Sequence, residues 1–321
     1  MIEIFHKFVK IYYLVLAIIG VPVNLLAIVI LSQGKCGLSV CISRYLLAMA
    51  TADLLVVINE VILYRVSYYY FRGSFLDMTP VCSIIIVLSH ISTNTSVWFT
   101  VSFTFDRFVA ICSQKLKRKY CTEKTAAVVI ATTSLLFCLK SLPFYFTLKH
   151  DAIIDNVPWD CLTKDNYFTD LGWVIFDWFD SVLTPLLPFA LILLLNFLTI
   201  RHILVKSRVR KELRGQSRGG NHSDPEMASR RKSVILLFAV SGSFTLLWLT
   251  TVAEFLYYNI TDANFADYTN SVIVFEQFGY MLQILSSCTN TFIYGVTNTK
   301  FREQFRIMLK YPVKLITKLT K

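Results

Sequence analysis

The sequence predicts an all-α membrane protein, a bundle of seven transmembrane helices followed by a short amphipathic eighth helix. Of its 321 residues, 55% are hydrophobic and only 17% are charged, so the chain is more apolar than a soluble domain. Seven apolar runs are close to the roughly 20 residues that cross a bilayer as a helix. We expect one domain over residues 1–321, with spans at about 9–32, 43–66, 80–112, 124–147, 172–205, 231–258 and 271–296.

The distribution of basic residues predicts the orientation of the bundle. Lys and Arg gather after the third, fifth and seventh spans, whereas acidic residues prevail in the loops on the other side. Because basic loops stay in the cytosol, we expect the N-terminus outside and the C-terminus inside. The net charge of +11 then lies mostly beside anionic membrane lipid, and we expect no nucleic-acid binding.

The first two spans each carry a polar side chain in mid-membrane. The first run is too long for a signal-peptide core, so we expect it to be retained as a span. Asn24 lies within it and needs a hydrogen-bond partner in the bundle. Asp53 is an isolated acid near the centre of the second span, where an ionisable residue is a functional candidate. The plainer interpretation of Asp53 is a protonated side chain that binds no ion.

The third span ends at an acid and a guanidinium, Asp106 and Arg107. Each charge would cost about 2.5 to 3.5 kcal/mol inside hydrocarbon, so we expect the pair where the helix leaves the membrane. The alternative is a snorkelling Arg beside a counter-charge, with no further role.

The eight cysteines divide by compartment under this topology. Cys82, at the outer start of the third span, and Cys161, in the loop before the fifth, lie on the oxidising side, so we expect a disulfide between them. The alternative is that all eight are free. Asn259 begins a glycosylation sequon on the outer side and is a candidate site, although it lies close to the end of the sixth span.

Proline and aromatic residues mark the later spans. Pro185 and Pro188 predict a local bend in the fifth span. Residues 215–225 are polar and glycine-rich, which predicts a short linker. Phe244 and Trp248 share one face of the sixth span at i and i+4. Beyond the last span, residues 298–310 alternate apolar and basic side chains, which favours an amphipathic helix along the inner membrane surface.

The order and spacing of these landmarks resemble the rhodopsin-like (class A) family of G-protein-coupled receptors over nearly the whole chain. The markers are Asn24, residues 46–53, Cys82 with Cys161, Asp106-Arg107-Phe108, Pro188, Trp248, Asn290 and Tyr294. Residues 24–32 and Leu247-Trp248 are similar to a small branch of orphan receptors proposed to sense aromatic amino acids or short peptides. The resemblance implies a plasma-membrane receptor for an extracellular small molecule or peptide that activates a heterotrimeric G protein, and the branch suggests the Gq class.

The resemblance also assigns roles to buried residues. Asp106 would hold Arg107 at rest, and on activation Arg107 would turn toward a Gα subunit with support from Tyr294. The relay between ligand and switch would use Phe244, Trp248 and Asn290. No cofactor is expected, apart from an allosteric sodium ion in a pocket that matches Asp53, Ser96, Ser286 and Asn290.

The chain departs from the family pattern at several positions. Thr250 and Thr251 can bend the sixth span only by bonding to the i−4 carbonyl, a weaker device than the usual Pro. Because an acid of the sixth span is missing, Asp106 would hold the switch nearly alone, and we expect appreciable activity without ligand. The departures are Thr250 and Thr291 for Pro, Asn196 for Tyr and Arg230 for the acid.

The upper halves of the spans supply candidates for a ligand pocket. Ser89 stands where amine receptors of the family carry Asp, which disfavours a biogenic amine, and the seventh span has no Lys for a retinal Schiff base. The candidates provide acids for a ligand cation, one Arg for a carboxylate and aromatic walls, which suits a zwitterionic amino acid or short peptide. They are Arg65, Ser89, His90, Asp180, Glu254, Tyr257, Glu276 and Tyr280. The alternative for each is a solvated charge at the rim.

Two other classes of membrane protein, a transporter or channel and an intramembrane enzyme, are alternatives to a receptor. A transporter or channel is the alternative, although the sequence contains no internal repeat of the kind that transporters usually show. An intramembrane enzyme would need metal ligands or paired acids in mid-membrane, and five His with one deep Asp provide no such site. We therefore expect no enzymatic activity.

Overall fold

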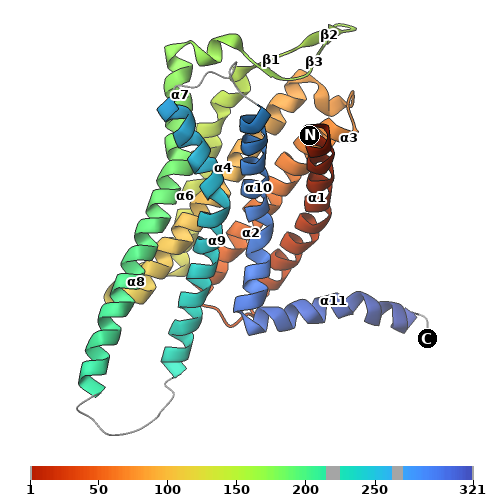
Figure 1. Cartoon of the computed structure of the whole chain (residues 1–321). Coiled ribbons are helices and arrows are strands. Elements are labelled where there is room, and N and C mark those ends of the chain that lie inside the picture. The colour runs from red at the N-terminus through yellow and green to blue at the C-terminus, as the bar shows by residue number, and fades with distance from the viewer. Residues whose placement is uncertain (1, 215–224, 262–269, 320–321) are drawn as a thin grey trace.

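The helices form one bundle in the computed structural model, which describes residues 2–214, 225–261 and 270–319 (Figure 1). The elements, in chain order, are α1 (Ile2–Ser32); α2 (Val40–Val56), a π-helical segment (Val57–Val66) and α3 (Ser67–Tyr70); α4 (Thr79–Cys112) and the short α5 (Gln114–Tyr120); α6 (Glu123–Ser141) with a 3-10 turn (Leu142–Thr147); α7 (Leu171–Ser181), a π-helical turn (Val182–Leu186) and α8 (Leu187–Arg214); α9 (Pro225–Thr261); α10 (Asn270–Thr297); and α11 (Thr299–Leu319).

Six of the described helical segments are long and apolar enough to cross a membrane. They correspond to the first six predicted spans. In α10 polar side chains, among them Glu276, Gln277 and Gln283, interrupt the apolar run. α10 packs against α1, α2 and α9 and completes the bundle as the seventh helix.

α4 lies in the middle of the bundle and contacts α2, α6, α8 and α9. The side chain of Phe103, in α4, is fully buried in an apolar cluster. Tyr45 of α2 and Tyr294 of α10 belong to the same cluster. This cluster fills the half of the bundle from which α11 departs, which we call the α11 end. The central position of α4 allows its residues to reach four other spans.

α11 follows α10 after a single residue. Asn298 caps it, because its Oδ1 accepts hydrogen bonds from the N–H groups of Lys300 and Phe301 at 3.0 and 3.1 Å. Figure 1 shows α11 turned across the base of the bundle. A helix is therefore present where residues 298–310 predicted one, and its place on a membrane surface stays a prediction.

A small β-hairpin marks the opposite end, which we call the hairpin end (Figure 1). β2 (Ala152–Ile154) pairs antiparallel with β3 (Val157–Trp159). Asp155 and Asn156 between them have φ of 51° and 61°, the left-handed conformation that two-residue hairpin turns require. β1 (Leu148–Lys149) pairs with β4 (Leu162–Thr163) and so closes the base of this loop.

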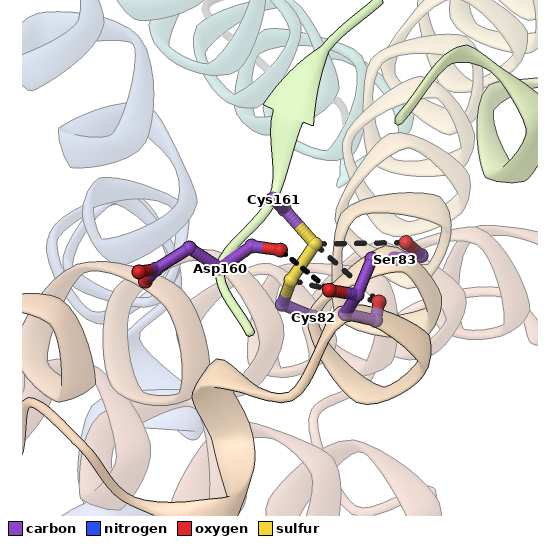
Figure 2. The surroundings of a disulfide bond; sticks show 5 residues. Cys82, Ser83, Asp160 and Cys161 are labelled. Carbon is purple, nitrogen blue, oxygen red and sulfur yellow. Dashed lines mark hydrogen bonds between the residues drawn. A yellow bond between two sulfur atoms is a disulfide. The ribbon is translucent and has the colours of Figure 1, made fainter. Parts of the chain in front are cut away.

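A disulfide joins Cys82, in the first turn of α4, to Cys161 between β3 and β4, as predicted (Figure 2). The hydroxyl of Thr79 adds a hydrogen bond to the carbonyl oxygen of Asp160 at 2.8 Å. The hairpin loop is therefore held to the start of α4, over the end of the bundle.

The predicted bend in the fifth span is present between α7 and α8. Thr184 has an extended backbone, with φ −154° and ψ 111°, directly before Pro185. Pro185 has no N–H to continue the helical ladder, which explains the break. The side chains of Arg230 and Asn259 lie outside the described residues.

Candidate functional site

A cavity of about 630 Å³ lies between the helices in the hairpin half of the bundle. Its walls come from the π-helical segment of the second span, α4, the turns after α6 and α7, α9 and α10. Six of the eight predicted ligand residues line it, namely Arg65, Ser89, His90, Asp180, Glu276 and Tyr280. Glu254 and Tyr257 do not, and Tyr257 is about half exposed.

An ion pair in one wall joins Arg65 to Glu60, with Nε and Oε1 2.9 Å apart. Residues five apart would point about 140° away from each other on an α-helix. The π-helical winding of Val57–Val66 brings both side chains to the cavity instead. The Arg65 guanidinium also lies 5.6, 5.1 and 5.6 Å from the ring centroids of Tyr13, Tyr64 and Tyr280. Arg65 is therefore not a free cation.

A second ion pair closes the other side of the cavity. Lys140 of α6 binds Asp180 of α7, and only 9% and 17% of these side chains are exposed. Lys140 Nζ also lies 5.6 Å from the ring centroid of Phe144, which stacks on His90 at a centroid distance of 3.7 Å. The charge of Asp180 is thus neutralised by a lysine that the sequence analysis did not single out.

Glu276 differs from the other acids that line the cavity. Glu60 is paired with Arg65 and Asp180 with Lys140, while Asp177 accepts a hydrogen bond from the Tyr167 hydroxyl at 2.7 Å. Among the residues that the structure describes, Glu276 has no ion-pair partner. Among the described residues the cavity therefore has one acid with neither an ion pair nor a hydrogen bond, Glu276 of α10.

Trp248 and Phe244 line the inner end of the cavity. Their rings stack at a centroid distance of 5.2 Å. Trp248 Nε1 donates to the Ser286 hydroxyl at 3.1 Å, and Ser286 in turn donates to the carbonyl oxygen of Gln283 at 2.7 Å. Ser286, a predicted sodium ligand, is thus tied to Trp248.

Asp53 is fully buried just beyond Trp248, in a polar network between three helices. It accepts hydrogen bonds from the Ser96 hydroxyl at 2.5 Å and from Asn290 Nδ2 at 2.8 Å. Three of the four predicted sodium ligands therefore meet, and their carboxylate, hydroxyl and amide oxygens are donors that a hard cation accepts. Within the described residues no cluster of three His, Cys, Asp or Glu side chains could hold a metal ion.

The acid and guanidinium at the α11 end are buried, with 0% of Asp106 and 4% of Arg107 exposed. Arg107 Nε donates to Asp106 Oδ2 at 3.0 Å, and its Nη2 completes the ion pair. Arg107 Nη1 donates to the Ser233 hydroxyl of α9 at 3.2 Å. The Cys41 thiol of α2 donates to Asp106 Oδ1 at 3.1 Å. This burial does not fit a snorkelling Arg.

Tyr294 is 1% exposed and its ring meets Phe301 edge-on at 5.9 Å. Its hydroxyl has no hydrogen-bond partner within the described part of the chain. The structure therefore does not join Tyr294 to Arg107.

Residues that depart from the family pattern form contacts of their own. Thr291, in place of Pro, donates to Asn24 Oδ1 at 3.2 Å and ties α10 to α1. Asn196, in place of Tyr, accepts a hydrogen bond from the Ser241 hydroxyl at 3.0 Å and ties α8 to α9. In α9 it is Ser241 and Thr245 that bond to i−4 carbonyls, at 2.7 and 2.9 Å. Thr251, where we expected such a bond, has none to a described residue.

Among the residues in these contacts that were not predicted are Glu60, Lys140, Cys41 and Ser233. The two charged ones had a signal in the sequence, because each stands inside an apolar span. Cys41 and Ser233 had none, because small neutral residues near the ends of spans are common.

The chain is similar to known receptors over most of its length. Residues 23–294 match the family described as 7 transmembrane receptor (rhodopsin family). Neuropeptide receptor 22 of Caenorhabditis elegans is 26% identical over 92% of this chain and 67% of its own length. Somatostatin receptor type 5 of Rattus norvegicus is 26% identical over 94% and 77%. 5-hydroxytryptamine receptor 4 of Homo sapiens is 24% identical over 92% and 77%.

Proposed function

Because the chain belongs to the rhodopsin family of seven-transmembrane receptors, we propose that this G-protein-coupled receptor binds an extracellular ligand through a cationic group. The observation that carries the proposal is the carboxylate of Glu276, which lines the cavity and has neither an ion pair nor a hydrogen bond to another residue that the structure describes. An ammonium or guanidinium group would compensate its charge. The walls also carry aromatic rings, among them Phe144, Trp248 and Tyr280, which suit the apolar part of a ligand, and many hydroxyl and amide groups.

A short peptide is the ligand class that fits these walls, because a zwitterionic amino acid would also need a cation for its carboxylate and Arg65 is paired with Glu60. A relative is named as a neuropeptide receptor and another as a somatostatin receptor, which supports a peptide. A third is named as a 5-hydroxytryptamine receptor, yet this chain has Ser89 where amine receptors of the family carry Asp. The amino terminus or a basic side chain of a peptide would then pair with Glu276.

The hairpin end is proposed to face the outside of the plasma membrane, with the N-terminus beside it. The bases that follow the third, fifth and seventh spans support this orientation. α11 would then lie along the inner surface in contact with anionic lipid.

Asp106 and Arg107 are proposed as the switch that faces the G protein. In the resting arrangement Arg107 is held by one acid and one hydroxyl, both neighbours that a partner's backbone carbonyls can replace. Tyr294 has an uncommitted hydroxyl and would support the released guanidinium. Phe244, Trp248 and Asn290 line the cavity and are the proposed relay toward this switch; the rings of Phe244 and Trp248 stack, and Asn290 donates a hydrogen bond to Asp53. The Gq class is the proposed partner.

The Asp53 network is proposed to hold a sodium ion in the resting state. Asp53, Ser96 and Asn290 are already joined by hydrogen bonds, so a cation would have to displace at least one of these contacts. Ser286 would join only after its bond to Trp248 shifts.

A cell assay tests the receptor function directly. Aromatic amino acids and short peptides are applied to cells that express the full chain with a panel of Gα chimeras, and calcium and cAMP are recorded. A response that Arg107→Ala abolishes at equal surface expression supports the proposed switch. Arg107→Lys keeps the charge but loses the fork of donors, so we expect only a partial response. A full response of Arg107→Ala would overturn the role of Arg107.

A further inference from the structure

The two carboxylate oxygens of Asp106 have different partners from different helices. Oδ2 accepts from Arg107, its neighbour in α4, at 3.0 Å. Oδ1 accepts from the Cys41 thiol of α2 at 3.1 Å. Asp106 is 0% exposed, and among the described residues the Cys41 thiol is the hydrogen-bond partner of Oδ1. The orientation of the carboxylate therefore depends on Cys41.

Cys41 is held in place by the turn before it and by the start of α11. The Ser39 hydroxyl caps α2 by accepting from the N–H of Ile42 at 3.4 Å. Asn298 Nδ2 donates to the carbonyl oxygen of Cys36 at 3.1 Å and ties this turn to the end of α10. Gly37, with φ 66°, permits the approach of Lys300, whose side chain would lie 2.9 Å from a Cβ at this position. Cys41 is itself 3% exposed.

We propose that Cys41 is a positioning residue of the receptor switch, whose thiol holds the Asp106 carboxylate so that its other oxygen faces Arg107. This inference rests on the proposed role of Arg107. A thiol is a weak hydrogen-bond donor, so it orients the carboxylate but adds little to the stability of the resting state. If the thiol is removed, Oδ1 is a buried acceptor without a partner, and the carboxylate gains by turning away from Arg107. The guanidinium is then released more often.

The test measures ligand-independent nucleotide exchange on co-expressed Gα chimeras by the full-length receptor at equal surface expression. We expect Cys41→Ala to raise the basal rate about threefold, the size of one weak buried hydrogen bond. Cys41→Ser replaces the thiol by a stronger donor and should bring the basal rate to or below that of the unaltered receptor. Cys36→Ala is the matched control, because that buried thiol contacts the carbonyl oxygen of Ile30 at 3.8 Å and not Asp106.

A double substitution separates positioning from a general loss of packing. Asp106→Asn removes the carboxylate that Cys41 orients, so Cys41→Ala should add no further increase in that background. The inference is overturned if Cys41→Ala and Cys41→Ser behave alike, or if Cys41→Ala raises the basal rate equally with and without Asp106→Asn. If Arg107→Ala leaves signalling intact, the proposed switch itself is wrong. If Arg107→Ala abolishes signalling but the Cys41 variants leave the basal rate unchanged, the proposed switch is supported and the positioning role of Cys41 is wrong.

Discussion

Arg107 on α4 donates a hydrogen bond to the hydroxyl of Ser233 on α9, with Nη1 and Oγ 3.2 Å apart. This contact joins α4 to α9 across the bundle. We expected Asp106 to hold Arg107 nearly alone, and Ser233 adds a neutral acceptor from across the bundle. Arg107 is therefore held by one ion pair within α4 and one hydrogen bond between helices.

We predict that Ser233→Ala raises ligand-independent signalling and that Ser233→Glu lowers it. A hydrogen bond to a charged group contributes about 1.5 to 3 kcal/mol, so the rise should be roughly 10- to 150-fold. Glutamate would replace the neutral acceptor by a counter-charge and lock α9 to α4. Basal nucleotide exchange at equal surface expression measures both effects.

Thr245→Ala is the control for Ser233, because that hydroxyl of α9 bonds only to its own helix, at the carbonyl oxygen of Ser241. Equal basal activity in Ser233→Ala and Ser233→Glu would mean that this contact does not restrain the switch.

We predict that sodium stabilises the purified receptor and that Asp53→Asn removes this effect. The carboxylate of Asp53 supplies the charge that balances the cation, while Ser96 and Asn290 supply neutral oxygens. Melting temperatures in sodium chloride and in choline chloride at equal ionic strength measure the difference without a ligand. Thr199→Val, a buried hydroxyl of α8 outside this network, should keep the sodium response. An undiminished sodium response in Asp53→Asn contradicts the site.

The sequence was sufficient to predict the bundle, because seven apolar runs leave few other arrangements in a membrane. It also predicted the Cys82–Cys161 disulfide, because these two cysteines lie on the oxidising side of the membrane in the predicted topology. It predicted the bend at Pro185, because a proline has no N–H to continue the helical hydrogen bonds. The grouping of Asp53 with Asn290 came from the resemblance, and the structure places these side chains 2.8 Å apart.

The state of each charged residue in the cavity was not predictable from the sequence. Arg65 looked like a free cation because an α-helix would point Glu60 away from it, and only π-helical winding brings the two together. Asp180 looked like a ligand site because its partner Lys140 comes from another span. Such pairings depend on how helices rotate and pack against each other.

We predict that Lys140→Met destabilises the receptor and that adding Asp180→Leu restores part of the loss. Removing one member of a buried ion pair leaves an uncompensated charge and costs about 3 to 5 kcal/mol, whereas an apolar pair of similar volume is often neutral. Thermal unfolding of the purified receptor and its surface expression measure this. The exposed pair of Lys149 and Asp165 is the control, and Lys149→Met should have little effect. A double variant that is less stable than Lys140→Met would refute the pairing argument.

The last prediction concerns Glu276, the lining acid that has neither an ion pair nor a hydrogen bond to another described residue. Glu276→Gln keeps the shape of the side chain and removes its charge, so a cationic agonist should lose about 10- to 150-fold in potency, the value of one charge-assisted hydrogen bond. Glu254→Gln is the matched control, because Glu254 is near α10, 3.4 Å from a Cβ placed on Gly279, but does not line the cavity. The potency of the agonist on Glu254→Gln should change little.

The agonist for this measurement is the most potent peptide or aromatic amino acid from the Gα-chimera screen. Its N-acetylated form, which lacks the ammonium charge, tests the same contact from the ligand side. If Glu276 binds that ammonium group, acetylation of the agonist strongly lowers its potency on the unaltered receptor. On the Glu276→Gln variant, acetylation should hardly change the potency. Equal losses in both receptors would place the ammonium group elsewhere in the cavity. Equal potency of the agonist on both receptors would show that Glu276 does not contribute to binding.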